Sequence, residues 1–353
     1  MPATMKIVAD SNIPFVQEAF CALGDVVLTP GRHMTPAVVR DADLLLVRSV
    51  TPVNAALLDG SRVRFVATAT IGTDHVDTAY LGLRGIGFAS AAGCNANSVA
   101  EYVVAALLEL SHCRGFRLRD KTLGVVGVGN VGSKVARYAR ALGLRVLEND
   151  PPRQRREHLP SFVSLEQILA AADIITLHVP LTRTGPDATF HLFEPRRGII
   201  INTSRGAVLD NRKLVTAPLD ALVLDVWEGE PHILPALLDK ATIATPHIAG
   251  YSFDGKVNGT VMIYQAACRH LGVTPSWRPK LTGPAQPVLA GDDLRAVVRQ
   301  AYDIRADDAA LRRDYRQFDR LRAEYPVRWE FFHYRTALPG ADAFGFQPVS
   351  GNP

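Results

Sequence analysis

The chain alternates short apolar runs with stretches whose apolar residues recur every three or four positions. We predict that five of the short apolar runs within roughly the first hundred residues form strands: KIVAD, DVVLT, LLLVRS, RFVATAT and GFASA. Helices are predicted between them near residues 14–23, 54–58 and 75–84. Alternating strands and helices are typical of a parallel sheet covered by helices, so this part is expected to form a small α/β unit.

A second set of strands follows a long helix. The segment from Asn97 to Cys113 carries apolar residues on one helical face, which predicts an amphipathic helix that bridges two lobes. The strands predicted after it are DIITLHVP, GIIINTS, ALVLDVW and ATIATPH, and a helix over about 253–271 leads back to the first lobe. The expected fold class is therefore α/β, with two Rossmann-like domains, parallel sheets and an active site in the cleft between the domains.

These elements predict three domains. A discontinuous substrate-binding domain is expected over 1–95 and 255–283, and a dinucleotide-binding Rossmann domain over 96–254. After Lys280 a proline-containing stretch indicates a linker. We interpret residues 284–353 as a small α/β domain that pairs subunits through the aromatic segment WEFFHYR. The alternative is a solvated helical tail.

A glycine-rich turn stands near the start of the second lobe. LGVVGVGNVGSKVARYARALGLRVLEND reads as strand, turn, helix and strand, with Gly127, Gly129 and Gly132 in G-x-G-x-x-G spacing. The first glycine permits a tight turn, the second lets backbone approach a pyrophosphate, and the third lets the helix pack on the strand. Asp150 closes the second strand, where a carboxylate accepts hydrogen bonds from ribose hydroxyls and repels a 2′-phosphate. The pattern predicts NAD in preference to NADP; the alternative is a turn that binds nothing.

Three polar side chains follow three later strands: Arg205, Glu230 and His247. Because ligands of open α/β sheets collect at the carboxyl ends of the strands, we expect these side chains to converge. A guanidinium can bind a substrate carboxylate, a histidine can accept a hydroxyl proton, and an acid can orient that histidine. Oxidation of a 2-hydroxy acid requires this chemistry. Taken singly, each residue has a structural alternative: a surface arginine, a capping acid and a histidine of the core.

Composition and charge favour an ordinary soluble enzyme. Of the 353 residues, 47% are hydrophobic and 21% charged, and the net charge is +4 with basic and acidic residues interleaved, which argues against a nucleic-acid partner. The four cysteines lack the paired spacing of a zinc site or a disulfide framework, so no metal is expected. The sequence starts without a signal-peptide pattern, and no apolar stretch is long enough for a membrane span. We expect a cytoplasmic protein.

Several segments resemble a known family. GVGNVG, INTSRGAVLD, LDVWEGEP and PHIAGYS are similar to motifs of the D-isomer-specific 2-hydroxyacid dehydrogenases, which implies NAD as cofactor. More narrowly, KIVADSNIPF, DADLLLVRSVTPVN, ATATIGTDHVD and AAGCNANSVAEYV resemble members that oxidise 4-phospho-D-erythronate to the 2-oxo acid in pyridoxal phosphate synthesis. The resemblance covers about residues 5–280 and, more weakly, the C-terminal domain, for which it implies a homodimer. The implied substrate is a small phosphorylated hydroxy acid.

The resemblance also assigns roles to residues. It implies that Arg205 binds the substrate carboxylate, that Glu230 supports the histidine and that His247 transfers the proton. The cofactor contacts that it implies are Gly127, Gly129, Asn130, Val131, Gly132, Asp150, the backbone at Val179, Thr203, Ser204, Arg205, Asp225 and Gly250.

On the substrate side the resemblance implies contacts from Ser49, Thr70 and Tyr251. We add Arg48 as a partner of the phosphate, because a guanidinium fork suits phosphate geometry. The alternative for Arg48 is an ion pair with a neighbouring acid such as Asp43.

The chain departs from the family pattern in two segments. Residues 181–200 are too few for the helix expected there, and residues 207–222 are also shortened, with Pro218 interrupting any helix. Both segments are predicted on the outer surface of the cofactor lobe, so we expect the catalytic geometry to survive.

Two other functions stay open. One is an NAD-sensing binding protein on the same fold, against which the intact set of Arg205, Glu230 and His247 argues. The other is a related dehydrogenase acting on 3-phosphoglycerate or glycerate, which would not account for Ser49, Thr70 and the C-terminal domain.

Overall fold

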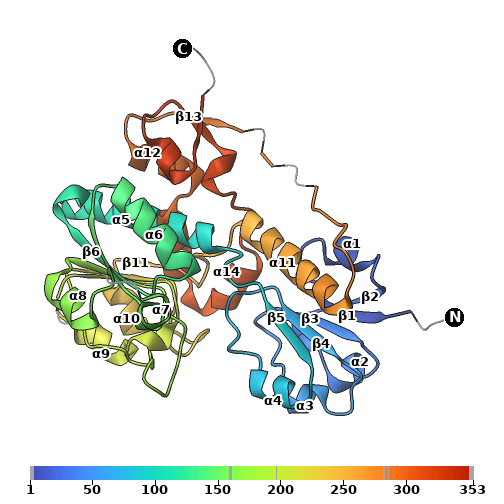
Figure 1. The fold of residues 1–353 in the computed structure, drawn as a ribbon. Coiled ribbons are helices and arrows are strands. Elements are labelled where there is room, and N and C mark those ends of the chain that lie inside the picture. The colour runs from blue at the N-terminus through green and yellow to red at the C-terminus, as the bar shows by residue number, and fades with distance from the viewer. Residues whose placement is uncertain (1–3, 159–160, 196, 281–282, 285, 350–353) are drawn as a thin grey trace. The chain divides into compact units, whose positions relative to one another are not determined.

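The computed structural model describes residues 4–158, 161–195, 197–280, 283–284 and 286–349. The chain forms two compact units (Figure 1). The first unit comprises Met1–Asn95 and Phe253–Thr282, and the second comprises Ala96–Ser252 and Gly283–Pro353. Within the described ranges, no helix combines the length and the apolar character that a membrane span requires.

The first unit contains a five-stranded parallel sheet with the order β2-β1-β3-β4-β5. Its strands are β1 (Lys6–Asp10), β2 (Asp25–Thr29), β3 (Leu44–Val47), β4 (Phe65–Thr68) and β5 (Gly87–Ser90). Its helices are α1 (Val16–Phe20), η1 (Gly31–His33), α2 (Pro36–Val39), α3 (Ala55–Leu58), α4 (Thr78–Leu83) and α11 (Phe253–Leu271). All five predicted strands are confirmed, and so is the helix predicted over 253–271. The short helix α2 was not predicted.

Alternation along the strands places this sheet between two helical layers. In β1, Ile7 and Ala9 face the buried cluster of α1 and α11, whereas Val8 faces the cluster of α2, α3 and α4. In β3, Leu44 and Leu46 likewise lie opposite Leu45. Because side chains alternate with a period of two, strands that are apolar at every position bury both faces of the sheet.

The second unit contains a six-stranded parallel sheet with the order β11-β10-β9-β8-β6-β7. Its strands are β6 (Thr122–Val126), β7 (Arg145–Asn149), β8 (Ile174–Leu177), β9 (Ile199–Asn202), β10 (Ala221–Leu224) and β11 (Ile243–Ala244). Its helices up to residue 252 are α5 (Ala96–Arg114), η2 (Leu118–Asp120), α6 (Asn130–Ala141), α7 (Pro151–Glu157), α8 (Leu165–Ala171), η3 (Gly206–Val208), α9 (Asn211–Thr216) and α10 (Pro235–Lys240). The predicted strands, the glycine turn and the long helix are confirmed.

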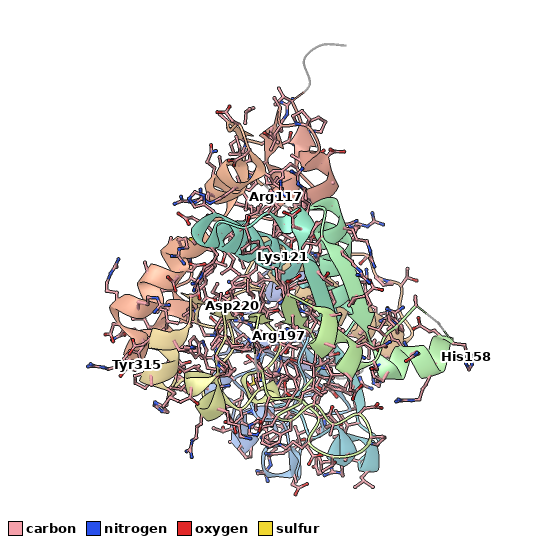
Figure 2. All side chains as sticks on the ribbon, turned by 90° about the vertical axis from the view of Figure 1, so that its left-hand side faces the viewer. Arg117, Lys121, His158, Arg197, Asp220 and Tyr315 are labelled. Atoms are coloured by element: carbon pink, nitrogen blue, oxygen red, sulfur yellow. The ribbon has the colours of Figure 1, made fainter. Side chains whose placement is uncertain are left out.

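Two buried clusters hold the second sheet. Residues of α5 and α6 cover one face, and residues of α8, α9 and α10 pack against the other. Figure 2 labels Lys121 and Asp220, which directly precede β6 and β10, and Arg197, which lies two residues before β9. Since these strands are parallel, the three residues mark the amino-terminal edge of the sheet. Arg205 and His247 follow β9 and β11 and therefore lie at the opposite edge.

The C-terminal segment of the second unit forms a small α/β part of its own. It contains β12 (Val288–Leu289), β13 (Arg335–Thr336), β14 (Gln347–Pro348), α12 (Leu294–Ala301), α13 (Ile304–Arg313), η4 (Tyr315–Gln317), α14 (Phe318–Ala323), η5 (Phe331–His333) and η6 (Ala341–Phe344). Val297, Leu311, Phe318 and Phe331 are fully buried. The alternative of a solvated helical tail is therefore wrong, because the apolar residues of these helices contribute to the core of the unit.

Candidate active site

The glycine turn has the geometry that a dinucleotide requires. Gly127 has a φ of +86°, which favours glycine, and a Cβ on Gly132 would lie 1.9 Å from the carbonyl oxygen of Gly127. A Cβ on Gly129, in contrast, would meet no atom within 4 Å. The first glycine therefore forms the turn, the third allows α6 to pack closely, and the second leaves space for a ligand. Asn130 and Val131 begin α6, whose free N–H groups suit phosphate oxygens.

Asp150 supports this turn from the end of β7. Its Oδ2 accepts a hydrogen bond from the N–H of Val128 at 2.8 Å, and its Oδ1 accepts one from Arg153 at the start of α7. The carboxylate is half-buried beside the turn. This position fits a negative charge next to an adenosine ribose.

Glu230 and His247 form a hydrogen-bonded pair. Nδ1 of His247 lies 2.8 Å from Oε2 of Glu230, and Oε1 of Glu230 accepts a hydrogen bond from the N–H of Trp227 at 2.8 Å. A third of the His247 side chain is exposed, compared with a fifth of Glu230. With Nδ1 held by the carboxylate, Nε2 is the nitrogen that can exchange a proton with a substrate.

The backbone also constrains His247. Its φ is +57°, a left-handed conformation that is strained for a residue with a side chain. Asp225, at 1% exposure, stabilises this loop through hydrogen bonds from the hydroxyl of Thr245 and from the N–H groups of Ile248 and Ala249. Sequence analysis predicted Asp225 as a cofactor contact but not its role in holding the histidine loop.

Burial and charge oppose each other at the two carboxyl groups. Burial alone would raise the pKa of Glu230, but the charge and hydrogen bond of His247, together with the N–H of Trp227, lower that pKa below its usual value. At Asp225 burial dominates and raises the pKa, against the opposing effect of His247 and the loop donors. Glu230 is therefore the carboxylate that stays ionised beside the imidazole.

Arg205 occupies the loop after β9, next to the strand that precedes Glu230. It is half-buried, and its guanidinium donates a hydrogen bond to the carbonyl oxygen of Ser204. Asn202 shapes this loop: its amide donates to the carbonyl of Arg205, and its oxygen accepts from the N–H and hydroxyl of Ser204. Arg205 thus lies at the same strand edge as Glu230 and His247, and its side chain is aimed by a short local network.

The predicted cofactor contacts at the end of β8 and β9 lie together. The Thr203 hydroxyl is 3.3 Å from Nδ1 of His178, and the Thr176 hydroxyl is 2.9 Å from Nε2 of the same ring. Burial lowers the pKa of His178 below its usual range, so the ring is neutral. Val179 follows directly and is half-buried.

The substrate residues predicted in the first unit follow its strands. Arg48 and Ser49 come directly after β3, and Thr70 lies two residues beyond β4, where its hydroxyl contacts Thr68 at 2.7 Å and donates to the carbonyl of Gly72. Ser49 is exposed and Arg48 is half-buried. Asp43, the acid named as an alternative partner of Arg48, forms an ion pair with Arg62 at 3.5 Å.

The shortened segments have the predicted consequence. No helix forms between β8 and β9 in the described part of residues 181–200, and α9 ends before Pro218. A groove of about 590 Å³ lies beside this connection. It is lined by Leu169, Ala172, Ile175, Phe193, Glu194, Pro195, Arg197 and Ile200.

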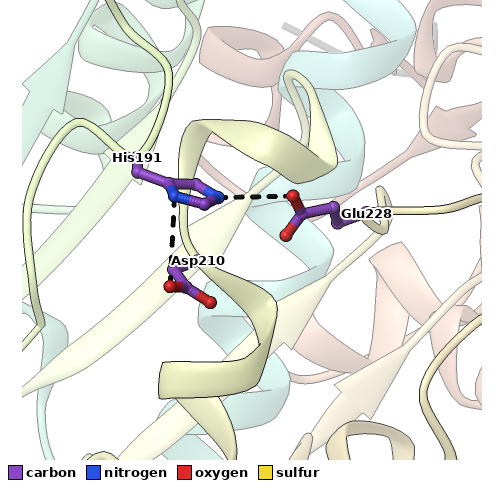
Figure 3. Close-up of side chains that lie close together, drawn as sticks. All are labelled: His191, Asp210 and Glu228. Carbon is purple, nitrogen blue, oxygen red and sulfur yellow. Dashed lines mark hydrogen bonds and ion pairs between the residues drawn. The ribbon is translucent and has the colours of Figure 1, made fainter.

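Figure 3 shows a cluster that sequence analysis missed: His191, Asp210 and Glu228. Nε2 of His191 lies 3.3 Å from Oε1 of Glu228, and Nδ1 lies 3.9 Å from Oδ2 of Asp210. The carboxylates thus face different nitrogens of one ring, whereas a single cation uses one imidazole nitrogen. We interpret the cluster as a polar link that ties the shortened segment to the loops that carry Arg205 and Glu230. The expectation of no metal stays a prediction.

Comparisons with known proteins agree with these features. Residues 94–249 match the family model described as "D-isomer specific 2-hydroxyacid dehydrogenase, NAD binding domain", and residues 282–342 match a domain of unknown function. The erythronate-4-phosphate dehydrogenase of Salinibacter ruber is 51% identical over 88% of this chain and 86% of its own length. That of Chromohalobacter salexigens is 47% identical over 95% and 94%.

Two solved structures share the fold. A D-lactate dehydrogenase from Aquifex aeolicus, complexed with NAD and lactic acid, is 24% identical with a TM-score of 0.61 over 76% of this chain and 95% of its own. An NAD-dependent formate dehydrogenase from Staphylococcus aureus is 21% identical with a TM-score of 0.62 over 76% and 96%.

Proposed function

Because the chain belongs to the erythronate-4-phosphate dehydrogenases, within the D-isomer-specific 2-hydroxyacid dehydrogenases, we propose that it oxidises 4-phospho-D-erythronate to the 2-oxo acid 3-hydroxy-2-oxo-4-phosphooxybutanoate. The enzyme is an NAD-dependent dehydrogenase. The observation that carries the proposed chemistry is the His247–Glu230 pair at the strand edge that also holds Arg205. The product is proposed to serve pyridoxal phosphate synthesis.

We assign the roles by charge and geometry. Arg205 would bind the substrate carboxylate, because a guanidinium stays charged and offers two parallel donors. Nε2 of His247 would accept the proton of the C2 hydroxyl as the C2 hydride departs, so that the carbon becomes a ketone. Glu230 would stabilise the imidazolium that results. When bound, NAD supplies the hydride acceptor.

The residues that would hold NAD follow from the turn. We propose that the N–H groups at Gly129 to Gly132 bind the pyrophosphate and that Asp150 binds the adenosine ribose. Val179, Thr203, Ser204, Asp225 and Gly250 stay predictions for the nicotinamide side. Ser49, Thr70, Tyr251 and Arg48 stay predictions for the substrate.

The test is a substrate panel. Purified protein with NAD is expected to oxidise 4-phosphoerythronate with a kcat/KM at least about tenfold above those for 3-phosphoglycerate, glycerate and D-erythronate. A higher value for 3-phosphoglycerate or glycerate would favour the other dehydrogenase. NADH binding with negligible turnover of every acid would favour a sensor protein instead.

We also propose a homodimer formed through the C-terminal part. Phe331 is buried in the core of the second unit, but Phe332, Val327 and Val288 are 41%, 67% and 59% exposed. Exposed aromatic side chains such as Phe332 are enriched at interfaces between subunits. Light scattering of the full-length chain at micromolar concentration is expected to give twice the monomer mass, and truncation after about residue 284 a monomer. A monomeric full-length chain would rule the interface out.

We propose a cytoplasmic location because none of the four cysteines forms a disulfide, and a reducing compartment keeps cysteines as thiols. Cell fractionation tests it, and recovery in a membrane or periplasmic fraction would contradict it.

A further inference from the structure

A helix of the C-terminal part brings a cation to the catalytic loop. Arg322 lies on α14, and its guanidinium carbon is 5.7 Å from the ring centroid of Tyr251 and 6.0 Å from that of Phe318. Tyr251 is four residues beyond His247 and packs edge-on against Tyr325, with 5.8 Å between ring centroids. Aromatic rings thus fix the position of the guanidinium beside the loop that carries His247.

Among the residues that the structure describes, Arg322 has neither a hydrogen-bond acceptor nor an ion-pair partner. Its Nε is buried without an acceptor, and the two terminal nitrogens keep access to solvent, since neither is an orphaned buried atom. Arg320 on the same helix is exposed and pairs with Glu324 at 2.9 Å. The buried Nε without a partner costs free energy, and the two accessible terminal nitrogens are the donors that a bound ligand could use.

The charge of Arg322 reaches the catalytic pair. Burial raises the pKa of Glu230, and Arg322 is one of the charges, after His247, that lower it. The guanidinium contacts the ring of Tyr251, four residues beyond His247, and it forms no ion pair with Glu230.

We propose that Arg322 binds the phosphate of the substrate. The inference rests on the proposed function, in which the substrate carries a carboxylate and a phosphate. Arg205 is assigned to the carboxylate and His247 to the C2 hydroxyl, so the second anionic group requires a second cation. A guanidinium fork on an aromatic support suits the oxygens of a phosphate. The C-terminal part thereby takes part in substrate specificity.

The experiment compares 4-phosphoerythronate with D-erythronate as substrates of three variants. Arg322→Gln is expected to lower kcat/KM for the phosphorylated acid about 10- to 100-fold, the worth of a hydrogen-bonded charge, and to change that for D-erythronate less than about twofold. Arg322→Lys should recover part of the loss. Arg320→Gln is the matched control from the same helix and should change neither value.

Inorganic phosphate provides a second readout. It is expected to inhibit the wild type competitively and to raise its melting temperature, and both effects should weaken in Arg322→Gln. A loss that is equal for the two substrates, or a shifted pH profile, would show instead that Arg322 positions Glu230 and would overturn the proposal. The proposal would also be overturned if Arg48→Gln removed all discrimination between 4-phosphoerythronate and D-erythronate while Arg322→Gln kept that discrimination.

The failure of the proposed function gives a different result. If the wild type does not oxidise 4-phosphoerythronate, that function is wrong, and the melting experiment with inorganic phosphate still decides on Arg322. Equal stabilisation of the wild type and Arg322→Gln by phosphate would then overturn the inference.

Discussion

Two crossover connections of the six-stranded sheet differ in how they are built. Between β6 and β7 the chain forms α6, twelve residues long, which buries Val135, Ala136 and Ala139 against the sheet. Between β8 and β9 the described residues form no helix, and this connection borders a groove whose lining includes Ile175 and Ile200, which stay 5% and 1% exposed. One crossover of the sheet is therefore built as a helix, and the other is a connection without a helix beside a groove.

The difference separates two roles of a crossover helix. We propose that the N-terminus of α6 binds the pyrophosphate of the cofactor, so loss of this helix would remove both the packing and the phosphate site. The β8–β9 connection contributes His178 and Val179 at one end and Arg197 at the other, and its described part forms no helix but carries His191, which contacts Asp210 and Glu228. A chain can lose the helix of such a connection and keep its site, because the strand-end loops are held by their own hydrogen bonds.

The largest expected effect is that of His247→Ala, which changes the site at the strand ends and leaves the cover of the sheet intact. We expect kcat to fall roughly 10²–10⁴-fold, the usual contribution of a positioned acid or base, while the Kd of NADH changes less than about twofold. Arg197→Ala, at the opposite edge of the sheet, is the control and should leave kcat unchanged. Turnover of more than about half the wild-type value in His247→Ala would remove the histidine from the proposed mechanism.

Two leucine substitutions compare the face of the sheet that α5 and α6 cover with the groove beside the β8–β9 connection. Leu123 is fully buried on the face that α5 and α6 cover, whereas Leu169 is half-buried and lines the groove. Leu123→Ala is expected to lower the free energy of unfolding by about 2–5 kcal/mol, and Leu169→Ala by less than about 1 kcal/mol. Urea denaturation measures both. Similar losses would mean that the groove is covered in solution.

Two glycines separate packing from cofactor binding at the crossover that is built as a helix. Gly132→Ala places a Cβ against the carbonyl of Gly127, so it should cost about 1–3 kcal/mol of stability as well as NADH affinity. Gly129→Ala meets no neighbouring atom and should leave the melting temperature unchanged, yet weaken NADH binding about tenfold or more. Thermal melting and NADH fluorescence give the two values. Wild-type NADH affinity in Gly129→Ala would contradict the assigned pyrophosphate position.

The smallest expected effect concerns cofactor choice. Asp150→Ser keeps an N-cap acceptor for α7 but removes the charge, so the ratio of kcat/KM for NAD to that for NADP should fall about tenfold. Both cofactors are compared at saturating 4-phosphoerythronate. An unchanged ratio would show that another residue near the end of β7, such as Glu148, determines the preference for NAD over NADP.

The sequence by itself determined the two sheets, the glycine turn and the candidate pair of Glu230 and His247. Apolar strands, glycine spacing and helix periodicity are local signals, because backbone geometry repeats over a few residues. The position of His247 beyond its strand was equally local, and parallel strands align their carboxyl ends whatever the details of packing.

Only the tertiary structure decided which distant side chains meet. Arg322 reaches Tyr251, and His191 reaches Asp210 and Glu228, across loops whose path no local pattern specifies. The burial of Asp225 and its role under the histidine loop depend in the same way on the turns that follow β10 and β11. Contacts between segments far apart in sequence follow from the packing of the whole unit. The length of residues 181–200 therefore predicted the missing helix, but the groove beside that connection is lined by several elements and could not be predicted.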